Sequence, residues 1–471
     1  MYGRGACIFK ERRLTPLKRN RYEIDMCSGS LMPKLISFAL PLIFSGILQL
    51  LFNAVDLVVV GRFSGSNALA AVGASTFIIH IFVNFFIGIS LGVNVTVARY
   101  YGAEDEKRTE RAVHTAILTA IISGVLSMAL GIALAQPALR LLGTPDSIIG
   151  LSKLYIRIYF LGTPFFMLYN FGAAVLRAVG DTKRPMIYLI ISGMVNAILN
   201  VIFVTVFKMS VAGVAIATAI SQLLSCVMIL VTLIKSDTCY KLDLRKICID
   251  KAILKQIFMI GVPAGLQSTV ITASNALLQS SVNSFGENAV AGYAASNNIF
   301  GFMFVTVNSI TQGCMSFVSQ NLGAGKLKRM KKSFYYSLIL ELTIGFAAGA
   351  FVYILRPQLI GLYSDNPEVI TYGVEIFALS TLTYFMCGFM DCTAGAMRGM
   401  GYSAVPMVLS LIGTVAIRVI WIYYFFPANR NVRYLFISYP LSWVCTFIMQ
   451  MICYMFVIHI VNKKYKQQAK D

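Results

Sequence analysis

Residues 35–60 read LISFALPLIFSGILQLLFNAVDLVVV, and Asp56 is the single charged side chain among them. A helix needs about 20 apolar residues to cross the hydrocarbon core of a membrane, so this stretch predicts a membrane-spanning helix. It is also longer than the apolar region of a secretory signal peptide.

The rest of the chain has the same character. Of its 471 residues, 57% are apolar and 13% are charged, against about 45–50% and about 25% in soluble proteins. We therefore predict an all-α polytopic membrane protein with about twelve spans. The expected spans are 35–60, 77–98, 113–136, 151–175, 187–207, 213–234, 256–283, 290–318, 334–355, 369–396, 406–426 and 434–461.

The positive charge is distributed unevenly between the two sides of the membrane. With the N-terminus in the cytoplasm, 31 of the 40 Lys and Arg residues fall in cytoplasmic tails and loops, 8 fall on the opposite side, and Arg418 lies within a span. Cytoplasmic loops of membrane proteins are enriched in Lys and Arg. We therefore expect a multi-pass protein of the inner (plasma) membrane with both termini cytoplasmic, and the net charge of +20 calls for no nucleic-acid partner.

The chain matches itself at a shift of 221–222 residues. FSGSNALAAVGAS (63–75) aligns with FGENAVAGYAAS (285–296), and Arg177 aligns with Arg398. Equivalent points are six spans apart, and an even number of spans preserves orientation. We therefore predict two parallel six-helix repeats with a cavity between two lobes. The expected division is a disordered basic tail (1–30), an N-terminal lobe (31–234), a cytoplasmic linker (235–255), a C-terminal lobe (256–461) and a cytoplasmic tail (462–471).

The same regions carry a set of motifs that resembles the multidrug and toxic compound extrusion (MATE) family over about residues 30–460. The motifs are Pro41, Asp56, Gly61, Gly65, Leu69-Ala70-Ala71, Val97-Ala98-Arg99, Gly102-Ala103, Leu176-Arg177, Gly180-Asp181-Thr182, Pro185-Met186, Gly261-Val262-Pro263, Ala396-Met397-Arg398-Gly399 and Gly401. The resemblance implies two six-helix lobes. It also implies export of organic cations or other amphipathic compounds, driven by inward movement of Na⁺ or H⁺.

Asp56 is the first candidate coupling residue, because an ionisable side chain inside a span is costly and suggests use. Asn196 and Asn200 lie one helical turn apart in the fifth expected span. The resembled family has Asn-x-x-x-Asp there, with a Thr or similar group 18 residues later, so the resemblance adds Thr218 and marks Asn200 as a departure. Amide oxygens can ligate Na⁺ but do not take up a proton. The alternative role for both Asn residues is hydrogen bonding between helices.

In the second half, Asp391 and Arg418 are candidates for a buried pair between the tenth and eleventh spans. We interpret them as a structural ion pair, with substrate binding as the alternative. Glu341 in the ninth span could face either the cavity or the lipid headgroups.

The functional prediction is therefore a secondary active exporter, and not an enzyme. The sequence has no P-loop and no HExxH or GxSxG motif. We expect no cofactor beyond the coupling ion, no metal beyond Na⁺, and a monomer that contacts small-molecule substrates and membrane lipids. One alternative is a lipid-linked oligosaccharide flippase, which shares the fold. A channel or a membrane enzyme is the alternative from another class.

Overall fold

The computed structural model describes residues 20–468, and the regular secondary structure in that range is helical. The first half contains α1 (Leu31–Ser64), α2 (Ser66–Gly102), α3 (Glu106–Leu141), α4 (Asp146–Ala178), α5 (Lys183–Val201) and α6 (Ser210–Ile234). The second half contains α7 (Lys251–Asn283), α8 (Glu287–Gly323), α9 (Leu327–Leu340), α10 (Phe346–Ile354), α11 (Arg356–Gly361), α12 (Pro367–Ser380), α13 (Tyr384–Gly399), α14 (Ala404–Ser410), α15 (Ile417–Ile420), α16 (Val432–Phe436) and α17 (Ser438–Gln468).

Within residues 20–468, eleven helices are long and apolar enough to cross a membrane, and a bent pair raises the number to twelve. The pair is α12 and α13, whose axes differ by 53°. Thr381 and Thr383 at the break donate their hydroxyls to backbone carbonyls of the preceding turn. Such bonds compete with the helix and bend it. The predicted number of spans is confirmed, and the tenth span proves to be broken.

The helices that carry the first two expected spans, 35–60 and 77–98, extend beyond them. Helix α1 continues to Ser64 and α2 starts at Ser66. Gly65 alone separates them, with φ 86°, a value that a glycine adopts at little cost. The small residues that follow are helical, so they extend α2 well before residue 77.

The expectation of disorder is also wrong for residues 20–30, while residues 1–19 lie outside the described part. The two carboxylate oxygens of Glu23 accept hydrogen bonds from Tyr101 at 2.7 Å and from Tyr240 at 2.6 Å. The carbonyl of Met26 accepts bonds from Asn321 and Arg329. This segment therefore contacts both halves of the chain.

The internal repeat is visible in the backbone. The left-handed residues Gly65 and Gly286 open equivalent helices, and Gly180 and Gly401 occupy equivalent turns, each pair 221 positions apart. Glu104 has φ 58°, and its repeat equivalent, Gly325, has φ 70°.

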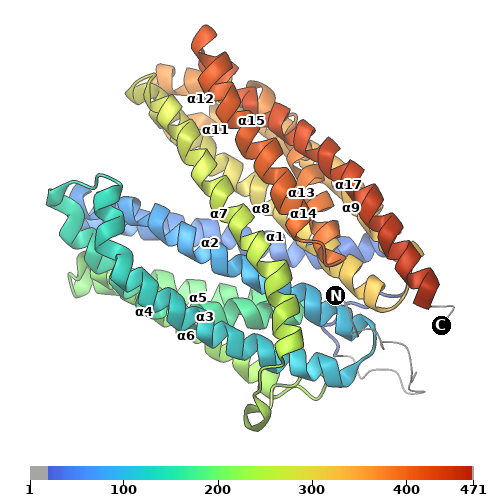
Figure 1. Ribbon diagram of the computed structural model, residues 1–471. Helices are drawn as coiled ribbons and strands as arrows, with labels where there is room; N and C mark the ends of the chain where they lie inside the picture. Colours follow the sequence, from blue (N-terminus) through green and yellow to red (C-terminus); the bar gives the residue numbers. More distant parts are fainter. Residues whose placement is uncertain (1–19, 469–471) are drawn as a thin grey trace.

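The ribbon forms two helix bundles that meet near the end that carries both termini and diverge toward the other end (Figure 1). At the meeting point the bundles touch through glycines. A Cβ at Gly88 would meet the backbone of Gly265, and a Cβ at Gly102 would meet the backbone of Gln320. Small residues let membrane helices approach this closely.

Two hydrogen bonds across this interface are related by the repeat. Gln320 on α8 donates to the carbonyl of Ala178 at 2.6 Å, and Arg99 on α2 donates to the carbonyl of Gly399 at 3.3 Å. Gln320 and Gly399 are the repeat equivalents of Arg99 and Ala178. Each half therefore makes the same contact to the other, as a two-fold axis along the membrane normal requires.

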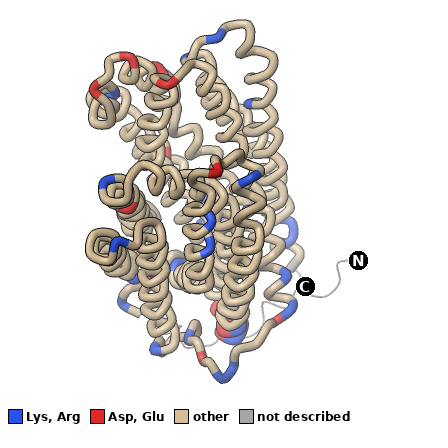
Figure 2. Tube along the Cα trace, turned by 90° about the vertical axis from the view of Figure 1, so that its left-hand side faces the viewer, with Lys and Arg blue, Asp and Glu red and all other residues tan. Residues whose placement is uncertain are grey.

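Figure 2 shows that the charged residues gather mostly at the two ends of the helices, with few along the middle. Charged side chains are therefore sparse along the middle of the helices. This arrangement is the one expected of helices that span a membrane.

We predict that Gly102→Leu weakens the packing of the two bundles, because the added side chain has no space beside Gln320. The expected cost is about 1–3 kcal/mol, typical of overpacking, and it should appear as a lower thermal unfolding temperature in detergent. Gly73→Leu is the matched control on the same helix, since nothing lies within 4 Å of a Cβ there. Equal stability of the two variants would contradict this description of the interface.

Candidate functional site

The four residues proposed for ion coupling come together in the first bundle. Asp56 on α1 accepts a hydrogen bond from the side-chain amide of Asn200 on α5. The same amide donates to Asn196 Oδ1 at 3.2 Å. Asn196 in turn donates to the hydroxyl of Thr218 on α6 at 3.4 Å. Three helices therefore contribute to one continuous polar cluster.

Local packing explains why α1 and α5 approach closely at this point. The ring of Phe52, one turn before Asp56, occupies the space that a Cβ at Gly193 would fill. Gly193 precedes Asn196 by almost one turn on α5. The missing side chain lets α1 lie against α5 so that Asp56 reaches the two amides, which share a helix face because they are four residues apart.

The amide of Asn196 has a second favourable orientation. When its oxygen and nitrogen are exchanged, the nitrogen donates to Asp56 Oδ1 at 3.0 Å and the oxygen accepts from the backbone nitrogen of Thr218 at 3.3 Å. In this orientation both amides donate to the same carboxylate. The cluster therefore places Asp56 among neutral donors, and no Lys, Arg or His in the part of the chain that the structure describes forms an ion pair with it.

One oxygen of the cluster has no partner among the described residues. Asn200 is fully buried, and its Oδ1 accepts no hydrogen bond. A buried polar atom without a partner is costly and calls for an explanation such as a bound ion. An amide oxygen beside a carboxylate is a suitable ligand pair for a hard cation such as Na⁺, which prefers oxygen ligands. The residues present thus fit a bound cation.

Two tyrosines of this region were not predicted from the sequence. Tyr155 and Tyr159 on α4 lie close enough to Asp56 to interact with it electrostatically, and their ring centroids are 6.3 Å apart. Their spacing of one helical turn is the only signal in the sequence that could have pointed to them. Aromatic residues are common in membrane helices, so that signal is weak.

The predicted ion pair between Asp391 and Arg418 is wrong. Among residues 20–468, no ion pair joins them. Arg418 instead donates to Asn275 at 3.0 Å and to Ser442 at 3.3 Å. Its guanidinium also lies 4.3 Å from the ring centroid of Tyr439. Neutral groups therefore accept the hydrogen bonds of this guanidinium. The positions of the two charges in the sequence did not indicate their partners.

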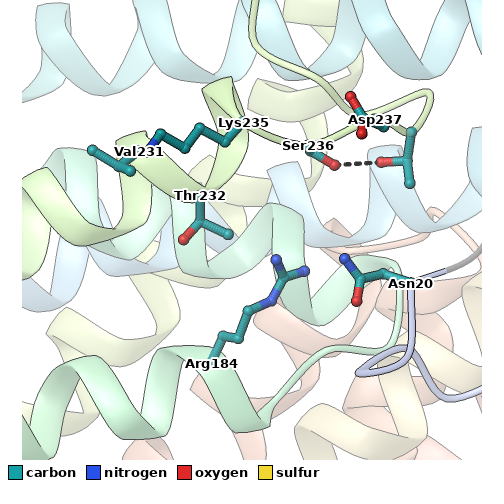
Figure 3. Close-up of a pocket in the computed structure, with 8 residues that line it drawn as sticks. Asn20, Arg184, Val231, Thr232, Lys235, Ser236 and Asp237 are labelled. Atoms are coloured by element: carbon teal, nitrogen blue, oxygen red, sulfur yellow. Dashed lines mark hydrogen bonds between the residues drawn. The ribbon is translucent and has the colours of Figure 1, made fainter.

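A cavity of about 380 Å³ lies near the linker, away from this cluster. Figure 3 shows Arg184 and Asn20 on one side of it and Ser236, hydrogen-bonded to Thr238, on the other. Arg184 is held by Asp181. Burial raises the pKa of this Asp181 carboxyl, and the charge of Arg184 opposes the effect. None of the residues lining the cavity belongs to the Asp56 cluster, so this cavity is not the coupling site.

Comparison with known proteins gives concordant matches. The MatE family model matches residues 41–202 and 263–424, one copy in each half of the chain. The chain is 28% identical over 389 residues to the probable multidrug resistance protein YoeA of Bacillus subtilis, covering 81% of this chain and 84% of that protein. It is 21% identical to the multidrug export protein MepA of Staphylococcus aureus, covering 82% and 86%.

Solved structures show the same fold. The chain matches a structure described as the outward-facing conformation of a multidrug resistance MATE family transporter, with a TM-score of 0.87, 20% identity and coverage of 95% and 100%. It matches MATE in complex with MaL6 with a TM-score of 0.86, 21% identity and coverage of 93% and 98%. Because the family model covers most of both halves, the chain belongs to the MatE family, the multidrug and toxic compound extrusion transporters.

Proposed function

We propose that this transporter exports amphipathic, often cationic, small molecules in exchange for Na⁺ or H⁺, with Asp56 as the coupling carboxylate. The relatives named as multidrug resistance and export proteins support the substrate class. The observation that carries the coupling proposal is the contact of Asp56 with two amides inside a membrane helix bundle. We further propose that it works as a monomer, surrounded by membrane lipids.

The physical basis of the coupling is the cost of charge in the membrane. A bare carboxylate at Asp56 gains stability when it binds Na⁺ or a proton, and this binding changes the charge of the lobe by one unit. An ion shifts the equilibrium between two conformations only if it binds one of them more tightly. The cluster spans α1, α5 and α6, so a relative shift of these helices changes the number of oxygens available to the ion.

Sodium is the ion that the cluster favours. The unpartnered Asn200 Oδ1 can ligate Na⁺, whereas an amide does not take up a proton. The position that carries an acid in the resembled motif is an amide here, so Asp56 is the single carboxylate of the cluster. Proton coupling through Asp56 alone is the alternative, and the two are separated by the ion dependence of transport.

The arrangement of the bundles supports alternating access. With both termini in the cytoplasm, the bundles meet at the cytoplasmic end and diverge toward the outside (Figure 1). This conformation would release substrate outward. Rocking of the two parallel repeats about their interface would open the opposite side.

Flippases of lipid-linked sugars need free cations to hold a pyrophosphate group. Arg418 is the cation deepest in the expected spans, and its guanidinium is already engaged by Asn275, Ser442 and Tyr439. This observation favours an exporter over a flippase.

We expect Asp56→Asn to abolish ion-driven export, because the amide carries no negative charge for Na⁺ or a proton to neutralise. The measurement is gradient-driven transport of a fluorescent cation in reconstituted vesicles, with expression and thermal stability as controls for folding. Full transport by a normally expressed Asp56→Asn protein would contradict the assignment.

Asn200→Asp should keep transport activity and change its dependence on Na⁺ and pH, because it adds a second carboxylate to the cluster. A roughly tenfold change in the Na⁺ concentration for half-maximal transport corresponds to about 1.4 kcal/mol of binding free energy. An unchanged Na⁺ and pH dependence would show that Asn200 lies outside the coupling site.

The orientation can be tested with single cysteines in a background without reactive native thiols. Leu142→Cys, in the exposed turn between α3 and α4, should react with an impermeant thiol reagent added to intact cells. Asp237→Cys, after the end of α6, should react only in permeabilised cells. The reverse pattern would overturn the proposed topology.

A further inference from the structure

Glu341 is a fully buried ionisable residue of the second bundle. Neither of its carboxylate oxygens has a hydrogen-bond partner among residues 20–468. It is not the solvated or headgroup-facing side chain that one reading of the sequence allowed. Because a buried carboxylate without a partner is costly, its position calls for a ligand.

Glu341 lies where the helices of this bundle are irregular. It is the first residue of a π-helical turn, Glu341–Gly345, that joins α9 to α10. Its carboxylate occupies the space over Gly388 on α13 that a Cβ there would fill, and Asp391 follows Gly388 by one turn. Further along, a Cβ at Gly349 would meet the backbone of Thr381 at the break between α12 and α13. π-Helical turns and broken membrane helices are both frequent at functional sites.

The groups that face Glu341 are acidic, or they are weakly polar side chains. The carboxylate interacts electrostatically with Asp391 on α13 and Cys314 on α8. The titratable groups of α13 that interact with Glu341 in turn are Tyr384, Cys387 and Cys392. Within residues 20–468, no Lys, Arg or His lies within ion-pair distance of it.

Two basic side chains of this bundle donate their hydrogen bonds to neutral groups, and one of them, Arg398, also interacts electrostatically with Asp391. Arg398, two turns beyond Asp391, donates to Gln267 at 2.6 Å. Arg418 donates to Asn275 and Ser442. The negative charge of Glu341 is therefore not balanced by the protein itself.

The surroundings distinguish between the two coupling ions. A hard cation such as Na⁺ requires several oxygen ligands, but the groups next to Glu341 include thiols and the glycine backbone of α13. A proton needs only the carboxylate. We propose that Glu341 is a proton-binding site of the second bundle, protonated in this conformation and exchanging its proton when the α12–α13 break changes its packing.

This inference rests on the proposed transport function but places a separate site in the other repeat. The Asp56 cluster offers amide and carboxylate oxygens, whereas Glu341 faces a second carboxyl, that of Asp391, together with thiols and Tyr384. Two facing carboxyls favour uptake of a proton by one of them, because charging both is costly. The protein would then bind a proton in one bundle whichever ion binds in the other.

Infrared difference spectroscopy of the purified protein in lipid tests the proposal, because a protonated carboxyl has its own carbonyl band. The unsubstituted protein should show this band at mildly acidic pH and lose intensity as the pH is raised. Glu341→Gln should lack the pH-dependent part of this carbonyl band, which we call the Glu341 component. The matched control Glu287→Gln changes an exposed acid at the start of α8 and should keep it.

The remaining variants separate the possible results. Asp56→Asn should keep the Glu341 component even though its transport is abolished, so failure of the Asp56 assignment and failure of this inference are distinguishable. If Glu341→Gln does not fold, Glu341→Asp should keep the band at a shifted frequency. A component that survives unshifted in the Glu341 variants would overturn the proposal. So would a component with constant intensity at every pH, since it would mark a permanently protonated structural acid.

Discussion

The interior of a membrane contains no water to solvate an isolated charge, and both bundles of this transporter are arranged around that constraint. In the first bundle Asp56 lies among amides, one of which retains an unpartnered oxygen. In the second, Glu341 has no hydrogen-bond partner within the described range 20–468 and lies at an irregular point of the helix packing. A carboxylate in either place is costly unless something neutralises it. We propose that the neutralising ion is the one that the transporter exchanges.

The interface between the bundles gives that exchange a mechanical consequence. Arg99 and Gln320 make equivalent contacts in opposite directions, and closely approaching glycines lie beside them. Contacts of this kind are short and backbone-based, so they are made or lost over small movements. The interface can therefore serve as the support about which two similar bundles rock, with residues 20–30 contacting both of them.

Much of the fold followed from periodicity, because spans and repeats are long patterns in which single residues matter little. The cluster of Asp56, Asn196, Asn200 and Thr218 was also predictable, since helical spacing and family motifs marked it. The break at Thr381, the ordered segment around Met26 and the partners of Arg418 were not predictable. Each depends on local hydrogen bonds or on residues far apart in the sequence. The presence of two opposite charges such as Asp391 and Arg418 does not indicate which residues each of them contacts.

If Asp56 couples transport to an ion as proposed, an ion gradient drives export. The most direct test is accumulation of a fluorescent organic cation in inside-out vesicles, with a Na⁺ gradient and a pH gradient imposed separately and no ATP present. We expect accumulation that depends on the imposed gradient, with a Na⁺ gradient sufficient by itself. Accumulation that is unaffected by either gradient would contradict it.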